Sequence, residues 1–114
     1  MRIAANSIRD HPKGRIYDVR VDGKSIVLRL SFHALQRMAL WQLTERRILE
    51  ALLFPEEVLR GHGDRLIAHR RYGSHLVRVV YEYESHIPVV ITVYFPSAAR
   101  YFQGGQRHEG RILS

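Results

Sequence analysis

The chain has 114 residues, which is enough for one domain with a single core. Its formal net charge of +7 favours an anionic partner. Almost all of the basic residues are arginines, whose forked guanidinium groups match phosphate geometry, so RNA is the first candidate partner. The lack of cysteine excludes disulfides, thiolate zinc sites and cysteine nucleophiles. The sequence has neither an apolar run of about 18 residues nor a signal-peptide core, which favours a cytoplasmic protein without membrane contact.

The first predicted element is a β-hairpin over residues 15–30. Its two strands, residues 16–21 and 25–30, are rich in β-branched side chains and flank Asp22-Gly23, a dipeptide favoured in tight hairpin turns. We therefore expect residues 1–30 to form an N-terminal hairpin extension.

A short helix is predicted to follow the hairpin. Ser31 is suited to cap a helix over residues 32–41, in which the apolar side chains share one side. His33 and Arg37 lie one turn apart on the opposite, polar side. This is the most informative stretch of the sequence, because it offers a titratable ring and a cation to one ligand.

A second helix and three strands complete the predicted domain. Thr44 is suited to cap a helix over residues 45–53, and Phe54-Pro55 ends it. The strands are expected over residues 65–72, 75–84 and 87–95. The pattern predicts an α+β fold with two short helices packed on one face of a three- to four-stranded antiparallel meander. This domain would span residues 31–102, followed by a flexible tail over residues 103–114.

Alternation along the last two strands predicts a polar face on the sheet. Arg78, Thr92 and Tyr94 alternate with apolar residues, which are expected to meet the helices. The three polar side chains would therefore lie on the opposite face.

The sequence also resembles a known family. The pieces that carry the resemblance are residues 33–38 (HALQRM), 48–58 (ILEALLFPEEV), 76–81 (LVRVVY) and 90–94 (VITVY). In this order and spacing they are similar to domain-of-unknown-function family 4258, which is grouped with RelE-like and BrnT-like toxins in the barnase, EndoU, colicin and RelE superfamily of ribonuclease folds. The resemblance covers residues 32–102.

The resemblance implies an RNase-like active face and a cognate antitoxin protein as a partner. It places the family's histidine on His33, its helix arginine on Arg37, its strand arginine on Arg78 and its last-strand threonine on Thr92. The first function hypothesis is therefore a metal-independent endoribonuclease that acts as the toxin of a toxin and antitoxin pair.

A site of this kind would cleave RNA by acid–base chemistry. Cleavage of RNA without a metal or cofactor needs a base for the 2′-hydroxyl, an acid for the leaving 5′ oxygen and cations for the phosphate. His33 suits the first or second task. Arg37 and Arg78 can clamp the phosphate, with Thr92 and Tyr94 as hydroxyl donors.

Further residues are candidates for binding nucleic acid. They are His69, Arg70, Arg71 and Arg100. The arginines interleave with aromatic residues in Arg70-Arg71-Tyr72 and Arg100-Tyr101-Phe102, which suits phosphate contact and base stacking. His69 would act as a second acid or stack on a base. The spacing of the neighbouring histidines does not match a zinc site, so no metal is expected.

Each of these residues also has an ordinary structural interpretation. His33 can bond a carbonyl or face water, Arg78 can pair with Glu82, and His69 can be a solvated strand residue. Two rival functions follow from these interpretations. One is a non-catalytic domain of the same fold that binds nucleic acid or protein; the other is a structural or phage-encoded accessory protein with incidental charge.

Overall fold

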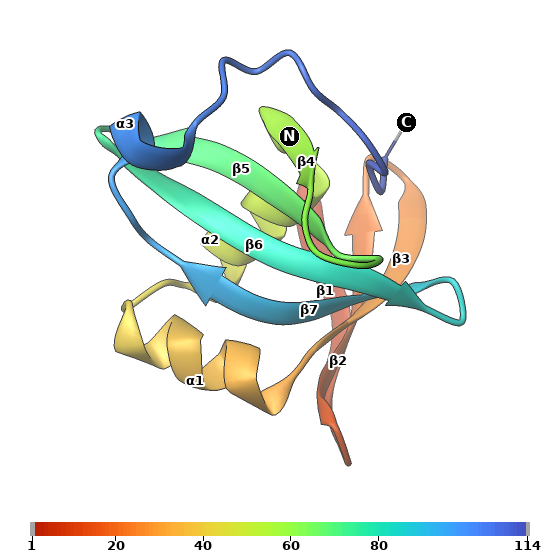
Figure 1. Ribbon diagram of the computed structural model, residues 1–114. Helices are drawn as coiled ribbons and strands as arrows, with labels where there is room; N and C mark the ends of the chain where they lie inside the picture. The colour runs from red at the N-terminus through yellow and green to blue at the C-terminus, as the bar shows by residue number, and fades with distance from the viewer. Residues whose placement is uncertain (1, 114) are drawn as a thin grey trace.

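The computed structural model describes residues 2–113, which form one mixed seven-stranded sheet and three helices (Figure 1). Along the chain the elements are β1 (Ile3–His11), β2 (Gly14–Val21), β3 (Lys24–Leu30), α1 (Phe32–Leu40), α2 (Glu45–Leu53), β4 (Glu57–Arg60), β5 (Leu66–Tyr72), β6 (His75–Glu84), β7 (Ile87–Tyr94) and α3 (Ala98–Tyr101). In space the strands lie in the order β1-β2-β3-β7-β6-β5-β4.

The prediction of a three- to four-stranded antiparallel meander with an N-terminal hairpin was wrong. β3 pairs in parallel with β7 through Arg29↔Val89 and Leu30↔Val90, and this pairing joins the hairpin and the meander into one sheet. Strands β1 and β4 extend the sheet at its two edges. β1 is exposed along most of its length and β4 has only 4 residues, so neither strand carries the apolar alternation that periodicity detects.

The local predictions for the hairpin and the first two helices are confirmed. Asp22 and Gly23 both have positive φ, as the tight turn between β2 and β3 requires. The Ser31 hydroxyl accepts a hydrogen bond from the Ala34 amide at 3.0 Å, and the Thr44 hydroxyl accepts one from Arg47 at 3.1 Å. Each side chain thus satisfies an amide that the first turn of a helix leaves without a partner.

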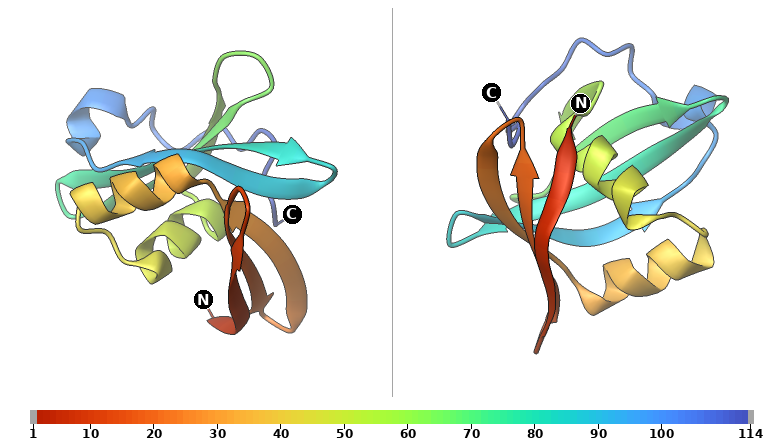
Figure 2. Two further views of the ribbon diagram at one scale, coloured as in Figure 1. Left: turned by 90° about the horizontal axis from the view of Figure 1, so that it is seen from below. Right: turned by 180° about the vertical axis from the view of Figure 1, so that it is seen from behind.

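The helices divide between the two faces of the sheet. α1 packs on β7, and α2 packs on β5 and β6, so that both lie on one face. α3 lies on the other face (Figure 2, left), and the segment after it passes from that face to the edge strand β4. The apolar core fills the space between α1, α2 and the curved sheet; its fully buried members include Tyr17, Leu28, Ile48, Leu52, Val79 and Tyr81.

A β-bulge in β7 changes which side chains face the core. The register between β6 and β7 shifts at Ile91, and Val90 becomes the partner of Tyr81. Simple alternation places Val90 on the polar face, whereas the structure places it in the core. Beyond the bulge the alternation holds, so that Thr92 and Tyr94 share one face.

The same bulge anchors the start of α1. The Ser31 amide donates to the Val90 carbonyl and the Ser31 hydroxyl donates to the Ile91 carbonyl, both at 3.0 Å. α1 is thereby held along β7, and its C-terminal end lies toward the polar face described below.

The segment after α3 runs along the edge strand β4 and ends against the core. Val58 donates its amide to the Arg107 carbonyl at 2.7 Å, and its carbonyl accepts from Glu109 at 3.2 Å. The Tyr81 hydroxyl donates to the Gly110 carbonyl at 2.8 Å, and Ile112 packs partly buried on the core. Within residues 2–113, no helix has the length and apolar character needed to cross a membrane.

Gly14 provides a test of the close approach between β2 and β3. It has φ +136°, and a Cβ atom there would overlap the carbonyl oxygen of Leu30. We expect Gly14→Ala to lower the free energy of unfolding by about 3 kcal/mol or more, because strain and overlap act together. Gly23 has φ +86° and open space around it, so Gly23→Ala serves as the control, with an expected loss of about 1 kcal/mol. Urea unfolding of both variants measures the difference, and equal losses would contradict the steric argument.

Candidate functional site

Four polar residues form a row across the second half of the sheet. Glu57 on β4 pairs with His69 on β5, His69 pairs with Arg78 on β6, and Arg78 pairs with Tyr94 on β7. Their chain neighbours belong to the apolar core; these include Val58, Ala68, Val77, Val79 and Val93. Because side chains alternate along a strand, the polar row faces away from α1 and α2.

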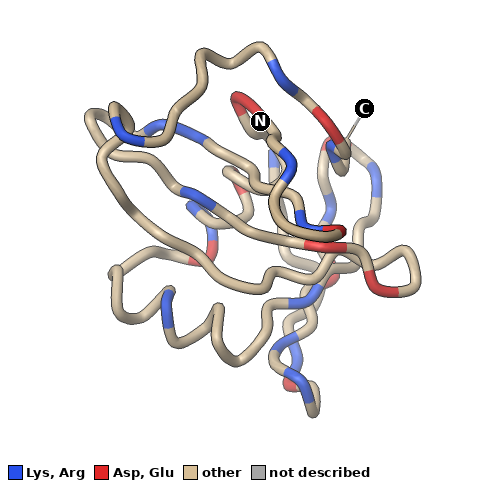
Figure 3. Tube along the Cα trace, viewed as in Figure 1, with Lys and Arg blue, Asp and Glu red and all other residues tan. Residues whose placement is uncertain are grey.

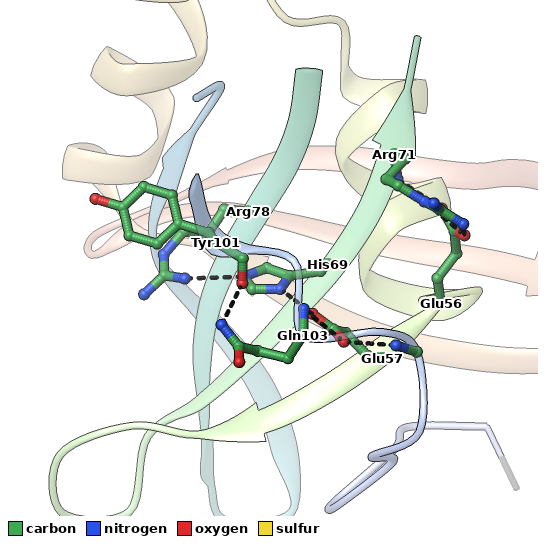
Figure 4. Close-up of polar contacts among 8 residues, drawn as sticks. Glu56, Glu57, His69, Arg71, Arg78, Tyr101 and Gln103 are labelled. Atoms are coloured by element: carbon green, nitrogen blue, oxygen red, sulfur yellow. Dashed lines mark hydrogen bonds and ion pairs between the residues drawn. The ribbon is translucent and has the colours of Figure 1, made fainter. Parts of the chain in front are cut away.

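The first three members of the row are joined by hydrogen bonds (Figure 4). His69 Nδ1 lies 2.6 Å from Glu57 Oε2, and His69 Nε2 lies 2.9 Å from Arg78 Nη1. A guanidinium can only donate, so Nε2 must accept and the proton of a neutral ring must sit on Nδ1. The charges of Glu57 and Arg78 are thus connected through an imidazole.

Burial sets the protonation of this group. Glu57 and His69 are both 0 % exposed. Burial lowers the pKa of His69 and outweighs the opposing effect of the hydrogen bond that His69 donates to the Glu57 carboxylate. Burial alone would raise the pKa of Glu57, but hydrogen bonds from His69 and from two backbone amides hold it below its usual value. At neutral pH the pair is therefore a carboxylate and a neutral imidazole.

The C-terminal segment closes over the row. The amides of Gln103 and Gly105 donate to the Glu57 carboxylate at 2.9 and 3.0 Å. The ring of Tyr101 lies over the Arg78 guanidinium, with 4.5 Å between the guanidinium carbon and the ring centroid. This is within the range of a cation–π contact.

A pocket of about 460 Å³ opens beside Arg78. It is lined by Trp41, Arg78, Tyr94, Pro96, Arg100 and Tyr101. A larger depression of about 500 Å³ lies between the N-terminal hairpin and α2, and one of about 410 Å³ lies between β3 and the β6–β7 turn, but neither contains a member of the polar row. We take the pocket at Arg78 as the candidate site because a buried polar network ends in it.

The cations of this pocket have no carboxylate partners. Within residues 2–113, neither Arg78 nor Arg100 forms an ion pair with Asp or Glu. Trp41, Tyr94 and Tyr101 supply aromatic walls around them. Such a lining can bind an anion through the arginines and a planar ring through the aromatic faces.

The structure brings three of the residues proposed from the sequence into this pocket: Arg78, Tyr94 and Arg100. Thr92 lies on the same face, but its hydroxyl is buried without a hydrogen-bond partner and does not line the pocket. The alternative pairing of Arg78 with Glu82 does not occur; Arg78 bonds His69 instead.

His33 and Arg37 lie on α1, outside the residues that line the pocket. His33 is exposed and Arg37 is half-buried, and neither makes a side-chain hydrogen bond within the described part of the chain. They precede Trp41 at intervals of one turn, so the three share one side of the helix. The helical rise puts His33 roughly 12 Å along the axis from Trp41.

The residues expected to bind nucleic acid on β5 have protein partners. His69 is buried and reaches the pocket only through Arg78. Arg70 donates to the Phe54 carbonyl at 2.7 Å, and Arg71 forms a forked contact with Glu56. Basic residues are spread over the strands, the N-terminal hairpin and the C-terminal segment (Figure 3).

Sequence analysis missed Glu57, Trp41 and Pro96 as parts of the site. Tyr101 was indicated only by the Arg-Tyr interleaving near the C-terminus. Glu57 carries no local signal, because its partners come from β5 and from residues 103–105. Across residues 2–113 there is no cluster of three or more His, Cys, Asp or Glu side chains suited to a metal ion.

Residues 30–95 match a family model described as Domain of unknown function (DUF4258). The chain belongs to this family. No curated protein and no solved structure matches it.

The DUF4258 region supplies only part of the pocket. Trp41, Arg78 and Tyr94 lie inside the matched residues, together with the buried Glu57 and His69. The remaining lining residues lie after the match ends; they are Pro96, Arg100 and Tyr101. The family region therefore provides the floor of the pocket, and the following segment provides a wall.

Stability should fall in acid because of the Glu57–His69 pair. The pKa of His69 is lower in the folded chain than its usual 6.5, so below pH 6.5 the unfolded chain binds more protons and stability declines toward the folded pKa. The lowered pKa of Glu57 adds a loss in the same direction below its usual 4.5.

Urea unfolding between pH 4 and 8 measures this effect. We expect stability to be fully present above pH 6.5 and to decline below it. In His69→Gln, which cannot titrate, the decline between pH 6.5 and 5 should be smaller. Identical profiles for the two proteins would show that His69 does not titrate differently on folding.

Proposed function

We propose that this protein binds RNA at the pocket around Arg78 and cleaves it without a metal ion. One observation carries the proposal. Two arginines without carboxylate partners, Arg78 and Arg100, line the same pocket as three aromatic side chains. Guanidinium groups suit a phosphodiester, and aromatic faces suit unstacked bases. The pocket volume of about 460 Å³ falls within the usual range for small-ligand sites.

The reaction is attack of the ribose 2′ oxygen on phosphorus. The 2′ oxygen forms a bond to phosphorus, the bond to the 5′ oxygen breaks, and a cyclic phosphate and a free 5′-hydroxyl result. Arg78 and Arg100 stabilise the charge that grows on the phosphate. The phenol of Tyr94 donates a proton to the leaving 5′ oxygen, and the 2′ proton passes to Tyr101, which must be in its phenolate form to accept it.

α1 extends the binding surface. His33 and Arg37 contact RNA beside the pocket, because the side of the helix that they share leads to Trp41. In this proposal His33 is a binding residue and not the base.

The resemblance to RelE-like and BrnT-like toxins supports a role in a toxin and antitoxin pair. The substrate would be cellular RNA in the cytoplasm, and the partner would be an antitoxin protein that covers the pocket.

Binding without cleavage is the second candidate function. The observation that favours it is the absence of His, Asp, Glu and Lys among the lining residues of this pocket. All proton transfer would then depend on phenols, which are weak bases at neutral pH.

One experiment separates these functions. The purified protein is incubated with a long single-stranded RNA in EDTA, beside Arg78→Ala, Tyr94→Phe and the control Arg9→Ala. We expect Arg78→Ala to weaken RNA binding tenfold or more, since a charge-assisted contact contributes about 1.5–3 kcal/mol. Tyr94→Phe should slow cleavage about 100-fold and change affinity less than threefold. Arg9 lies on β1, far from the pocket in the strand order, so its loss should have little effect.

The outcomes are distinct. Gel shifts that depend on Arg78 without cleavage products from the wild type would select the binding function. RNA affinity that is unchanged by Arg78→Ala would exclude the pocket as the site in both proposals. Arrest of growth on induction of the wild type but not of Arg78→Ala would support the toxin role.

A further inference from the structure

We propose that Glu57 and His69 are positioning residues that hold Arg78 and the Tyr101 wall in the arrangement needed to bind a phosphate. This inference rests on the proposed function of the pocket, but it concerns residues that never reach the ligand. Both side chains are fully buried, and both belong to hydrogen bonds that end at the pocket.

The hydrogen-bond donors around Glu57 leave only one arrangement of protons. The amides of Gln103 and Gly105 both donate to its carboxylate, so its oxygens act as acceptors. His69 must therefore present Nδ1–H to Glu57 and a lone pair on Nε2 to Arg78. Both ring nitrogens of His69 are thus paired, and Arg78 is held by a single donated bond.

We call the hydrogen-bonded series Glu57–His69–Arg78 the relay. Arg71, on the neighbouring strand, shows how an arginine is arranged when it binds a carboxylate directly, without such a relay. Arg71 binds Glu56 directly, through Nε at 3.1 Å and Nη2 at 2.7 Å, and its guanidinium lies 4.2 Å from the Phe102 ring centroid. Its charge and its fork are therefore already occupied (Figure 4). Arg78 lies under Tyr101 in the same way, but an imidazole stands between it and the carboxylate. Its remaining N–H groups are left for a ligand.

Glu57 also holds the opposite wall of the pocket. Tyr101 is separated from Gln103 by a single residue, and the Gln103 side chain returns to donate to the Tyr101 carbonyl at 3.0 Å. The carboxylate that orients Arg78 through His69 thus also fixes the segment that places Tyr101 over Arg78. One buried charge sets both sides of the site.

Three substitutions test this inference. His69→Gln keeps an acceptor toward Arg78 and a donor toward Glu57, whereas His69→Leu removes both. In Glu57→Gln the amide has one oxygen for three donors, and its NH₂ group moves the imidazole proton to Nε2, where it faces an N–H of Arg78. Glu56→Gln is the matched control, since it affects the adjacent arginine instead.

The first measurement needs no RNA. Nitrogen-15 NMR of the wild type should show His69 as the Nδ1–H tautomer and a slowly exchanging Arg78 guanidinium. Glu57→Gln should shift the tautomer toward Nε2–H and speed exchange at Arg78, while Glu56→Gln should leave both unchanged. A wild-type ring protonated on Nε2, or an unchanged Arg78 signal in Glu57→Gln, would overturn the inference whether or not the pocket binds RNA.

The second measurement is the affinity for a short single-stranded oligoribonucleotide at pH 7.5. We expect about tenfold weaker binding for His69→Leu and Glu57→Gln, and less than threefold change for His69→Gln and Glu56→Gln. Equal affinities for His69→Gln and His69→Leu would contradict a positioning role. If His69→Leu fails to fold, the comparison of Glu57→Gln with His69→Gln decides the same question. If the wild type binds no RNA but Glu57→Gln shows the expected NMR changes, the proposed function is rejected and the positioning of Arg78 by Glu57 and His69 stands.

Discussion

The site depends on the burial of one carboxylate. A buried negative charge is costly unless nearby donors compensate it, and Glu57 receives two backbone amides and an imidazole N–H. These three donors come from β5 and from the segment after α3, so the cost of burying Glu57 is offset only when both are in place. The carboxylate therefore links the formation of the sheet to the closure of the C-terminal segment over it.

The parallel pairing of β3 with β7 likewise links two parts of the fold that are separate in the sequence. It brings the N-terminal hairpin beside the meander, and the curved sheet that results has α1 and α2 on one face (Figure 2). The bulge at Ile91 lies next to this junction and receives the hydrogen bond from Ser31 that starts α1. The direction of α1, and with it the position of Trp41 at the pocket, follows from this local irregularity.

The sequence was informative wherever the cause of structure is local. Caps at Ser31 and Thr44 and the turn at Asp22-Gly23 act over a few residues, and the elements that they begin were predicted correctly. β1 is mostly exposed and β4 has only four residues, so neither has a clear pattern, and the parallel pairing joins strands far apart in the sequence; none of the three was predicted. The site divides in the same way: alternation placed Arg78 and Tyr94 on one face, but nothing local shows that Glu57 is buried or that His69 is a relay and not a solvated side chain.

The DUF4258 match ends at residue 95, so the boundary of the family region divides the residues that line the pocket. The matched region holds the buried pair Glu57 and His69 and the arginine that they orient. The wall contributed by residues 96–105 is attached to that scaffold through the backbone amides of Gln103 and Gly105 and through the rings of Tyr101 and Phe102. Backbone attachment places few demands on side-chain identity. Different side chains at wall positions outside the stacked rings, Arg100 among them, would therefore alter which ligand fits, while Arg78 stays in place.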